Sequence, residues 1–162
     1  WVEAIAEAGL QPAASKRPPA PQLEQPLVRH RGSSVITATP SDRFSLVGII
    51  DFPQAAIGRQ QLALELTPQR FVDEIAPART FGFRDQVEQL RAAGLIQGGA
   101  LDNALVCDGD QWMNPPLRFA DEPVRHKLLD LIGDLALVGF PQAQVLVYRG
   151  SHGLHTDLAA AL

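Results

Sequence analysis

The sequence predicts an α+β fold, a two-layer sandwich in which a mostly antiparallel sheet carries helices packed on one face. Strand-like runs gather in the first half of the chain, and helical patterns follow in the second half. The 162 residues are 46% hydrophobic and 20% charged, which is enough to bury one core without disulfides or a structural metal.

Charge, cysteine content and hydropathy exclude several other classes of protein. A net charge of −4 disfavours a nucleic-acid groove, which needs concentrated Lys and Arg. Cys107 is the single cysteine, so an internal disulfide is excluded and a reducing compartment such as the cytoplasm is indicated. The longest apolar runs, such as residues 46–50, fall far short of the ~20 residues that a transmembrane segment needs.

The beginning of the sequence suggests the end of one domain and a linker to the next. Residues 1–10 have a helical pattern, although the first residue is Trp1 rather than a methionine. Residues 11–26 hold five of the 13 prolines. Because proline fixes φ and lacks an N–H group, we expect an irregular linker there, followed by the main domain at residues 27–162.

Residues 27–76 are expected to form strands and then a helix. Turns rich in Gly, Ser, Pro and Asp separate the strand-like runs, and antiparallel pairing is the simplest arrangement for them. Thr67 is expected to cap the helix, with Pro68 at its first position and its end near Ala76. The predicted strands are residues 27–31, 35–39, 44–51 and 61–66.

Residues 78–162 are expected to alternate between strands and helices. Gly94 should end one helix, whereas Asp121 should cap the longest helix and Gly139 should end it. The predicted strands are residues 78–83, 104–107 and 144–148, and the predicted helices are residues 84–93, 123–138 and 156 onward.

The longest helix separates apolar from polar side chains. At about 100° per residue, His126, Asp130 and Asp134 follow one another, one turn apart, on one side. An imidazole and a carboxylate at this spacing could hold two positions of a tetrahedral Zn²⁺, and Asp134 could orient a catalytic base. The opposite side carries Val124, Leu128, Leu131 and Leu135.

A solvated helix face with a His–Asp pair would show the same pattern, so the spacing leaves both interpretations open. Gly133 favours a site, because glycine within a helix costs about 1 kcal/mol relative to alanine. Its missing side chain would leave room for a ligand beside His126 and Asp130.

Glycines on both sides of Ser151 and His152 predict an exposed loop after the last strand. Because imidazole titrates near neutral pH, His152 could transfer protons there, although a loop histidine is often merely solvated. The pattern assigns no role to His155, and His30 is expected at the surface.

Two more clusters precede the longest helix. Residues 78–83 place the Thr80 hydroxyl beside two aromatic rings, which could point into a cleft but is also typical of a packed strand end. Residues 94–102 contain three glycines without the Lys-Ser/Thr of a phosphate-binding loop, so a tight connection near an apolar channel is favoured.

Taken together, the four clusters resemble the carboxy-terminal domain of the UDP-3-O-acyl-N-acetylglucosamine deacetylase family. The resemblance implies zinc-dependent amide hydrolysis of a UDP-sugar lipid in lipid A synthesis, in the cytoplasm or at the inner face of the inner membrane. The resembling stretches follow the family's order and spacing, and they are residues 78–83, 94–104, 119–134 and 148–154.

The resemblance also implies roles for individual residues. His126 and Asp130 would be two of three zinc ligands. His152 would be the catalytic histidine, supported by Asp134, and the Thr80 hydroxyl would stabilise the oxyanion. The sugar nucleotide would contact Phe81 and Lys127. The passage for the acyl chain would be lined by Val87, Ile96, Leu101, Ala104 and Val106.

In the family, the third zinc ligand is a His and the general base is the Glu before it, both from the amino-terminal domain. No Glu-His pair occurs in these 162 residues. The resemblance therefore implies a fragment that is inactive alone and needs the missing amino-terminal domain as its partner. The alternative is a non-catalytic module that binds the acyl chain or the sugar nucleotide.

Overall fold

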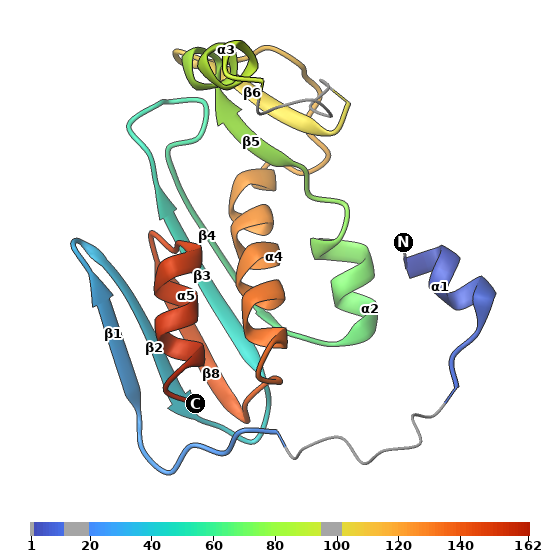
Figure 1. Ribbon diagram of the computed structural model, residues 1–162, viewed down its shortest axis with the longest axis vertical. Helices are drawn as coiled ribbons and strands as arrows, with labels where there is room; N and C mark the ends of the chain where they lie inside the picture. The colour runs from blue at the N-terminus through green and yellow to red at the C-terminus, as the bar shows by residue number, and fades with distance from the viewer. Residues whose placement is uncertain (1, 12–19, 95–101) are drawn as a thin grey trace.

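The computed structural model describes residues 2–11, 20–94 and 102–162, without the side chains of residues 90 and 91. It confirms the predicted α+β class, because α4 (Glu122–Ala136) and α5 (His152–Ala159) cover one face of a five-stranded sheet (Figure 1). The strands of this sheet, in spatial order, are β1 (Leu27–Arg31), β2 (Ser34–Pro40), β8 (Ala143–Tyr148), β3 (Ser45–Asp51) and β4 (Arg59–Glu65).

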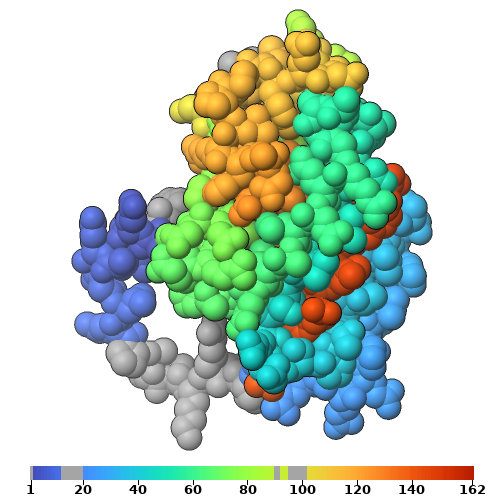
Figure 2. Space-filling model, turned by 180° about the vertical axis from the view of Figure 1, so that it is seen from behind, coloured from blue at the N-terminus to red at the C-terminus, as the bar shows by residue number. Residues whose placement is uncertain are grey.

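The last strand of the chain lies between two hairpins that come much earlier in the sequence. Within the described strands, β1–β2 and β3–β4 are antiparallel hairpins, and β8 pairs antiparallel with β2 but parallel with β3. From behind, the orange-red residues of β8 appear between the blue and cyan segments (Figure 2). The sheet is thus mostly antiparallel, as predicted, around one parallel pair.

A smaller sheet lies at one end of the larger one, with α3 (Arg84–Ala92) beside it (Figure 1). Its strands are β5 (Thr80–Phe83), β6 (Ala104–Asp108) and β7 (Gln111–Trp112). Since β5 and β6 pair in parallel, Thr80 lies opposite Ala104 and Gly82 lies opposite Val106. After α3, Gly94 adopts a φ of +72°, the left-handed conformation in which glycine often ends a helix.

The first described segment is α1 (Val2–Ala8). Most of the predicted linker falls on residues 12–19, which lie outside the described residues, so the domain boundaries remain predictions. In the described ranges, no helix combines the length and the apolar character that crossing a membrane requires.

The apolar side of α4 builds the core, as its periodicity predicted. Val124, Leu128, Leu131 and Leu135 are all 0% exposed. The helix lies close to the sheet, because a Cβ added to Gly48 of β3 would come within 2.8 Å of Leu128 Cδ2.

The helix predicted to begin at Thr67 does so, but its second half has a wider turn. The Thr67 hydroxyl accepts a hydrogen bond from the Arg70 N–H group at 3.2 Å, which caps α2 (Pro68–Arg70). A π-helical turn, η1 (Phe71–Ile75), follows directly.

Asp121 stands at the N-cap position of α4, as predicted, but its side chain does not cap the helix. Within the described chain, no hydrogen bond from the Asp121 side chain caps the helix. The Asp121 carboxylate instead accepts from Arg125 Nε at 2.7 Å. An i,i+4 ion pair with an arginine has replaced the cap at this end of α4.

The neighbouring Glu122 makes the more important contacts. Its carboxylate is 0% exposed and accepts hydrogen bonds from Arg79 Nε at 2.9 Å and from the backbone N–H groups of Arg79 and Arg118 at 2.9 and 2.6 Å. Burial by itself raises the pKa of this carboxyl, but these hydrogen bonds outweigh burial and hold the pKa below its usual value.

Replacing Glu122 with Gln should therefore lower the free energy of unfolding by about 3–5 kcal/mol, because it leaves the Arg79 charge nearly buried without its partner. Urea denaturation near neutral pH measures the loss. Since the pKa of Glu122 is lowered in the folded state, the difference should shrink as the pH falls below about 4.3.

The matched control is Glu88→Gln, which removes an exposed carboxylate paired with Arg84 on α3. Its effect should stay below about 1 kcal/mol. If Glu122→Gln and Glu88→Gln lowered the free energy of unfolding equally, the buried ion pair of Glu122 and Arg79 would not be the source of the stability.

Candidate functional site

The polar side of α4 is not a solvated face. The side chains of His126 and Asp130 are each 16% exposed, and that of Asp134 is 18% exposed. A freely solvated stripe would be far more accessible, so other parts of the protein shield these three groups from water.

His126 contacts the segment that leads into β5. Its Nδ1 lies 3.3 Å from the Ala78 carbonyl oxygen, and its Nε2 lies 3.5 Å from Asp130 Oδ1. Because a carbonyl oxygen only accepts, Nδ1 donates in this contact, and the Nε2 of a neutral ring then offers its lone pair toward Asp130.

The distance between these two atoms matches the spacing of ligands on zinc. Zinc bonds of about 2.0–2.2 Å at the tetrahedral angle separate two ligand atoms by about 3.4 Å. The Ala78 contact also suits a ligand, because metal-bound histidines commonly donate their other N–H group to a carbonyl oxygen or carboxylate. An ion pair between Asp130 and a protonated His126 would have the same spacing.

Lys127 links Asp130 to the aromatic side chains of β5. Its Nζ donates to Asp130 Oδ2 at 3.0 Å and lies 5.9 Å from the centre of the Phe81 ring. The Phe81 ring in turn meets the His126 ring edge-on, with 6.5 Å between their centres. The predicted ligands and the predicted sugar-nucleotide contacts therefore belong to one cluster.

His152 does not lie in a loop as predicted, but begins α5. The Ser151 hydroxyl accepts a hydrogen bond from the Leu154 N–H group at 3.4 Å and caps the helix four residues earlier than expected. His152 Nδ1 lies 2.8 Å from Asp134 Oδ2, and the His152 side chain is 69% exposed. Asp134 is thus at hydrogen-bond distance from His152, the residue that the resemblance implies it would support.

His155 is the residue that the sequence analysis missed. Its side chain is 1% exposed, and its Nδ1 lies 2.7 Å from the same Asp134 Oδ2 atom. Burial lowers the pKa of the His155 imidazole below its ordinary value, although Asp134 opposes this shift. The i,i+3 spacing from His152, which places both rings on one face of α5, was the available signal.

Asp134, His152 and His155 also form a candidate metal cluster, since one possible ligand atom from each lies within 4.8 Å of the others. However, both Nδ1 atoms are at hydrogen-bond distance from one carboxylate oxygen. The geometry therefore favours a hydrogen-bonded group here and leaves His126 and Asp130 as the pair that better fits a metal.

Thr80 and the predicted acyl-passage residues share one face of the smaller sheet. Because side chains alternate along strands, Thr80 and Gly82 of β5 lie on the same face as Ala104 and Val106 of β6. Val87 of α3 covers this face, 3.6 Å from where a Cβ on Gly82 would stand. Two further predicted residues, Ile96 and Leu101, lie outside the described residues.

A hollow of about 290 Å³ borders the cluster of His126, Lys127 and Asp130, between the end of β3 and the start of α5. It contains two cationic side chains, Lys127 and Arg149, together with Asp51 and Phe52. Arg149 has a φ of +51°, an uncommon conformation that is often found at functional sites.

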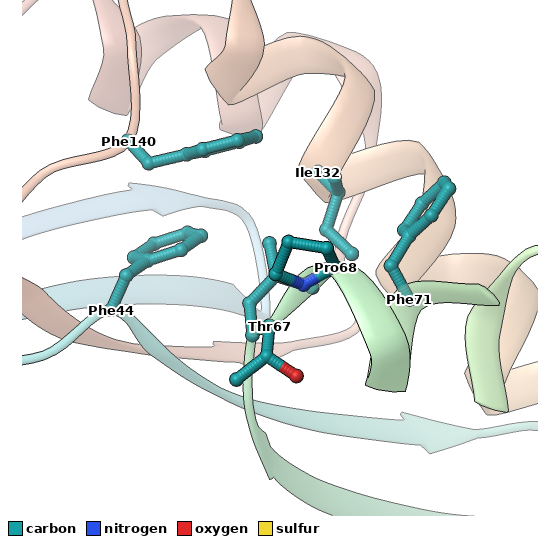
Figure 3. A pocket seen from close by; sticks show the side chains of 7 residues that line it. Phe44, Thr67, Pro68, Phe71, Ile132 and Phe140 are labelled. Atoms are coloured by element: carbon teal, nitrogen blue, oxygen red, sulfur yellow. The ribbon is translucent and has the colours of Figure 1, made fainter. Parts of the chain in front are cut away.

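A second hollow, of about 390 Å³, lies between the beginning of β3 and the residues after α4. The rings of Phe44 and Phe140 stack there with 5.0 Å between centres (Figure 3). Its lining within the described chain holds no titratable side chain, so it offers no group for acid–base or metal chemistry. The lining residues are Phe44, Leu66, Thr67, Pro68, Phe71, Ile132 and Phe140.

The sequence matches one family over its whole length. Residues 1–162 match the family described as UDP-3-O-acyl N-acetylglycosamine deacetylase. The UDP-3-O-acyl-N-acetylglucosamine deacetylase of Thermosynechococcus vestitus is 53% identical over 163 residues, which cover 100% of this chain and 56% of the relative.

Other relatives carry the same or a similar name. The UDP-3-O-acyl-N-acetylglucosamine deacetylase of a Synechocystis species is 51% identical over 98% of this chain and 58% of the relative. A probable UDP-3-O-acyl-N-acetylglucosamine deacetylase 1, mitochondrial, of Arabidopsis thaliana is 42% identical over 100% of this chain and 54% of the relative. The chain thus spans a little more than half the length of the curated relatives that it matches.

Gly133 has no packing reason to be glycine, because no described heavy atom lies within 4 Å of where its Cβ would stand. We expect Gly133→Ala to raise the free energy of unfolding by about 1 kcal/mol, measured by urea denaturation. If Gly133 leaves room for a ligand, the same substitution will also weaken metal binding to this chain. If Gly133→Ala is no more stable than the parent, the cost of glycine in the helix is contradicted. If its metal binding is unchanged, Gly133 does not leave room for a ligand.

Proposed function

Because the chain belongs to the UDP-3-O-acyl N-acetylglycosamine deacetylase family, we propose that it supplies part of the active site of a zinc-dependent deacetylase in lipid A biosynthesis. The observation that carries the proposal is the half-buried series His126, Asp130 and Asp134 on one side of α4, completed by His152 from α5. It supplies two side chains of the types that bind zinc and an imidazole beside a carboxylate, and these groups can serve zinc-dependent amide hydrolysis.

His126 and Asp130 would hold the zinc, His126 through Nε2 while its Nδ1 meets the Ala78 carbonyl oxygen. When bound, zinc polarises the amide carbonyl and activates water. Lys127 donates to the other Asp130 oxygen, so it keeps Oδ1 turned toward His126.

His152 would donate a proton to the substrate. Asp134 accepts from its Nδ1, which leaves Nε2 as the ring nitrogen that can face a substrate in the exposed space. A protonated His152 can balance the negative charge that develops on the substrate or protonate the leaving amine.

Thr80 would donate a hydrogen bond to the oxyanion. It is the first residue of β5, two positions after Ala78, whose carbonyl oxygen contacts His126. Its exposed side chain makes the hydroxyl accessible to a substrate. A donor aimed at a developing oxyanion is among the most effective catalytic groups.

The substrate would extend in two directions from this centre. Lys127 and Arg149, which both line the hollow of about 290 Å³, suit the diphosphate of a UDP-sugar, with Phe81 beside Lys127. The acyl chain would follow the face of the smaller sheet that Val87, Ala104 and Val106 share, with Ile96 and Leu101 as further proposed lining residues.

The metal site would need a third ligand and a general base from elsewhere. In the part of the chain that the structure describes, no third His, Cys, Asp or Glu joins His126 and Asp130 in a possible metal group. We therefore propose that an amino-terminal domain supplies both groups and that this chain alone is inactive. The cytoplasm remains the proposed location, although the names of the Arabidopsis relatives include the word mitochondrial.

Zinc should stabilise the chain through His126 and Asp130. We expect zinc to raise the thermal midpoint of the chain, and His126→Ala or Asp130→Ala to weaken zinc binding at least about tenfold. Isothermal titration calorimetry measures the affinity, and His30→Ala, which removes an exposed imidazole of β1, should leave it unchanged.

The candidate cluster at Asp134 predicts the opposite pattern. If His152→Ala abolishes zinc binding while His126→Ala leaves it intact, then zinc binds Asp134, His152 and His155, and the assignment to His126 and Asp130 is wrong.

Activity can be tested in a chimera in which this chain replaces the matching part of the Thermosynechococcus relative. We expect zinc-dependent release of acetate from UDP-3-O-acyl-N-acetylglucosamine by the chimera and none by the chain alone. Thr80→Val should lower kcat by about 10²–10³-fold because it removes the donor but keeps the shape, whereas Thr80→Ser should retain most of kcat. Substrate binding without turnover in the folded chimera would favour the non-catalytic module.

A further inference from the structure

His155 takes no part in the proposed chemistry, yet it contacts the group that orients His152. Asp134 Oδ2 lies 2.7 Å from His155 Nδ1 and 2.8 Å from His152 Nδ1. An ionised carboxylate only accepts hydrogen bonds, so both rings donate to this one oxygen.

The two donors differ in their freedom to move. The His152 side chain is 69% exposed, whereas that of His155 is 1% exposed. The two rings stand nearly at right angles, with 6.2 Å between their centres and 76° between their planes. A carboxylate that is held only by an exposed ring could rotate toward solvent, whereas a second, buried donor would oppose this rotation.

The surroundings of His155 hold its ring in place. A Cβ on Gly150 would lie 2.6 Å from His155 Nε2 and 2.9 Å from Val147 Cγ2, so the ring fills the space that the glycine leaves. Among the described residues, His155 Nε2 meets no hydrogen-bond partner. A buried, unpartnered nitrogen costs stability, and therefore packing alone does not explain a histidine here.

The charged and titratable groups that act on His155 are Asp134, His152 and Asp130. Burial lowers the pKa of His155 and so favours its neutral ring, although Asp134 opposes this shift. A neutral ring with its proton on Nδ1 donates to Asp134 without adding a charge that would repel a protonated His152.

We propose that His155 is a positioning residue that fixes the Asp134 carboxylate so that Oδ2 meets the Nδ1–H group of His152 and Nε2 of His152 faces the substrate. The catalytic role of His155 rests on the proposed function. The orientation of His152, however, is a property of this chain and can be measured without activity.

The test compares two replacements of His155. In His155→Asn the amide nitrogen stands where Nδ1 of the histidine stands, so the donor to Asp134 is kept. In His155→Leu the donor is lost while an apolar side chain fills the site. His155→Gln, whose amide nitrogen is one bond further out, replaces the leucine variant if that variant does not fold.

The first measurement is the tautomer of His152 in this chain, read from its ¹⁵N chemical shifts at a pH where the ring is neutral. We expect the Nδ1–H tautomer in the parent and in His155→Asn, and a mixture of tautomers in His155→Leu. An unchanged tautomer in His155→Leu would overturn the inference.

The second measurement is kcat in the chimera. His155→Leu should lower kcat by about 10–100-fold with little change in KM, and His155→Asn should restore most of it. Equal losses of kcat in both variants would mean that His155 acts only through packing, which also overturns the inference. If the parent chimera is inactive, the proposed function fails, whereas the tautomer measurement still decides the role of His155.

Discussion

The buried carboxylate of Glu122 joins the segments from which the site is built. It binds the side chain and backbone of Arg79 and the backbone of Arg118, and Arg79 immediately precedes Thr80. Glu122 also lies one turn before His126 on α4. A single carboxylate therefore holds the strand with the proposed oxyanion donor at a constant distance from the helix with the proposed zinc ligands. Separating the buried Glu122 carboxylate from its partners would cost much stability. These contacts therefore keep the smaller sheet in place against α4.

The packing of α4 against the sheet determines which way its polar side chains face. Its apolar side is fixed against the sheet by Leu128, Leu131 and Leu135, which are fully buried. This packing leaves the helix no freedom to rotate, so the opposite side must face β5 and α5. His126 then contacts the Ala78 carbonyl oxygen, and Asp134 contacts two histidines of α5. Groups placed on a rigid, packed helix keep their geometry better than groups on a loop.

The sequence predicted the parts of the fold that depend on local physics. The cap at Thr67, the apolar side of α4 and the class of the fold agree with the structure. The predictions failed where a local signal competed with a stronger partner. Asp121 has the residue type of a cap but pairs with Arg125, and the glycines around His152 suggested a loop although Ser151 caps a helix there. The place of β8 between two hairpins could not be predicted, because residues 143–148 pair with strands about a hundred positions earlier.

The sequence alone determined which side chains share a helix face, because the helical repeat depends only on backbone geometry. It thereby placed His126, Asp130 and Asp134 in one line, and the resemblance of four clusters indicated the family. Only the tertiary structure decided which groups meet that line from other elements. Asp134 and His155 are 21 positions apart, and Arg79 and Glu122 are 43 positions apart. Contacts of this kind depend on how whole elements pack, because burial in the core, rather than any local pattern, removes the water that would otherwise separate these charged groups.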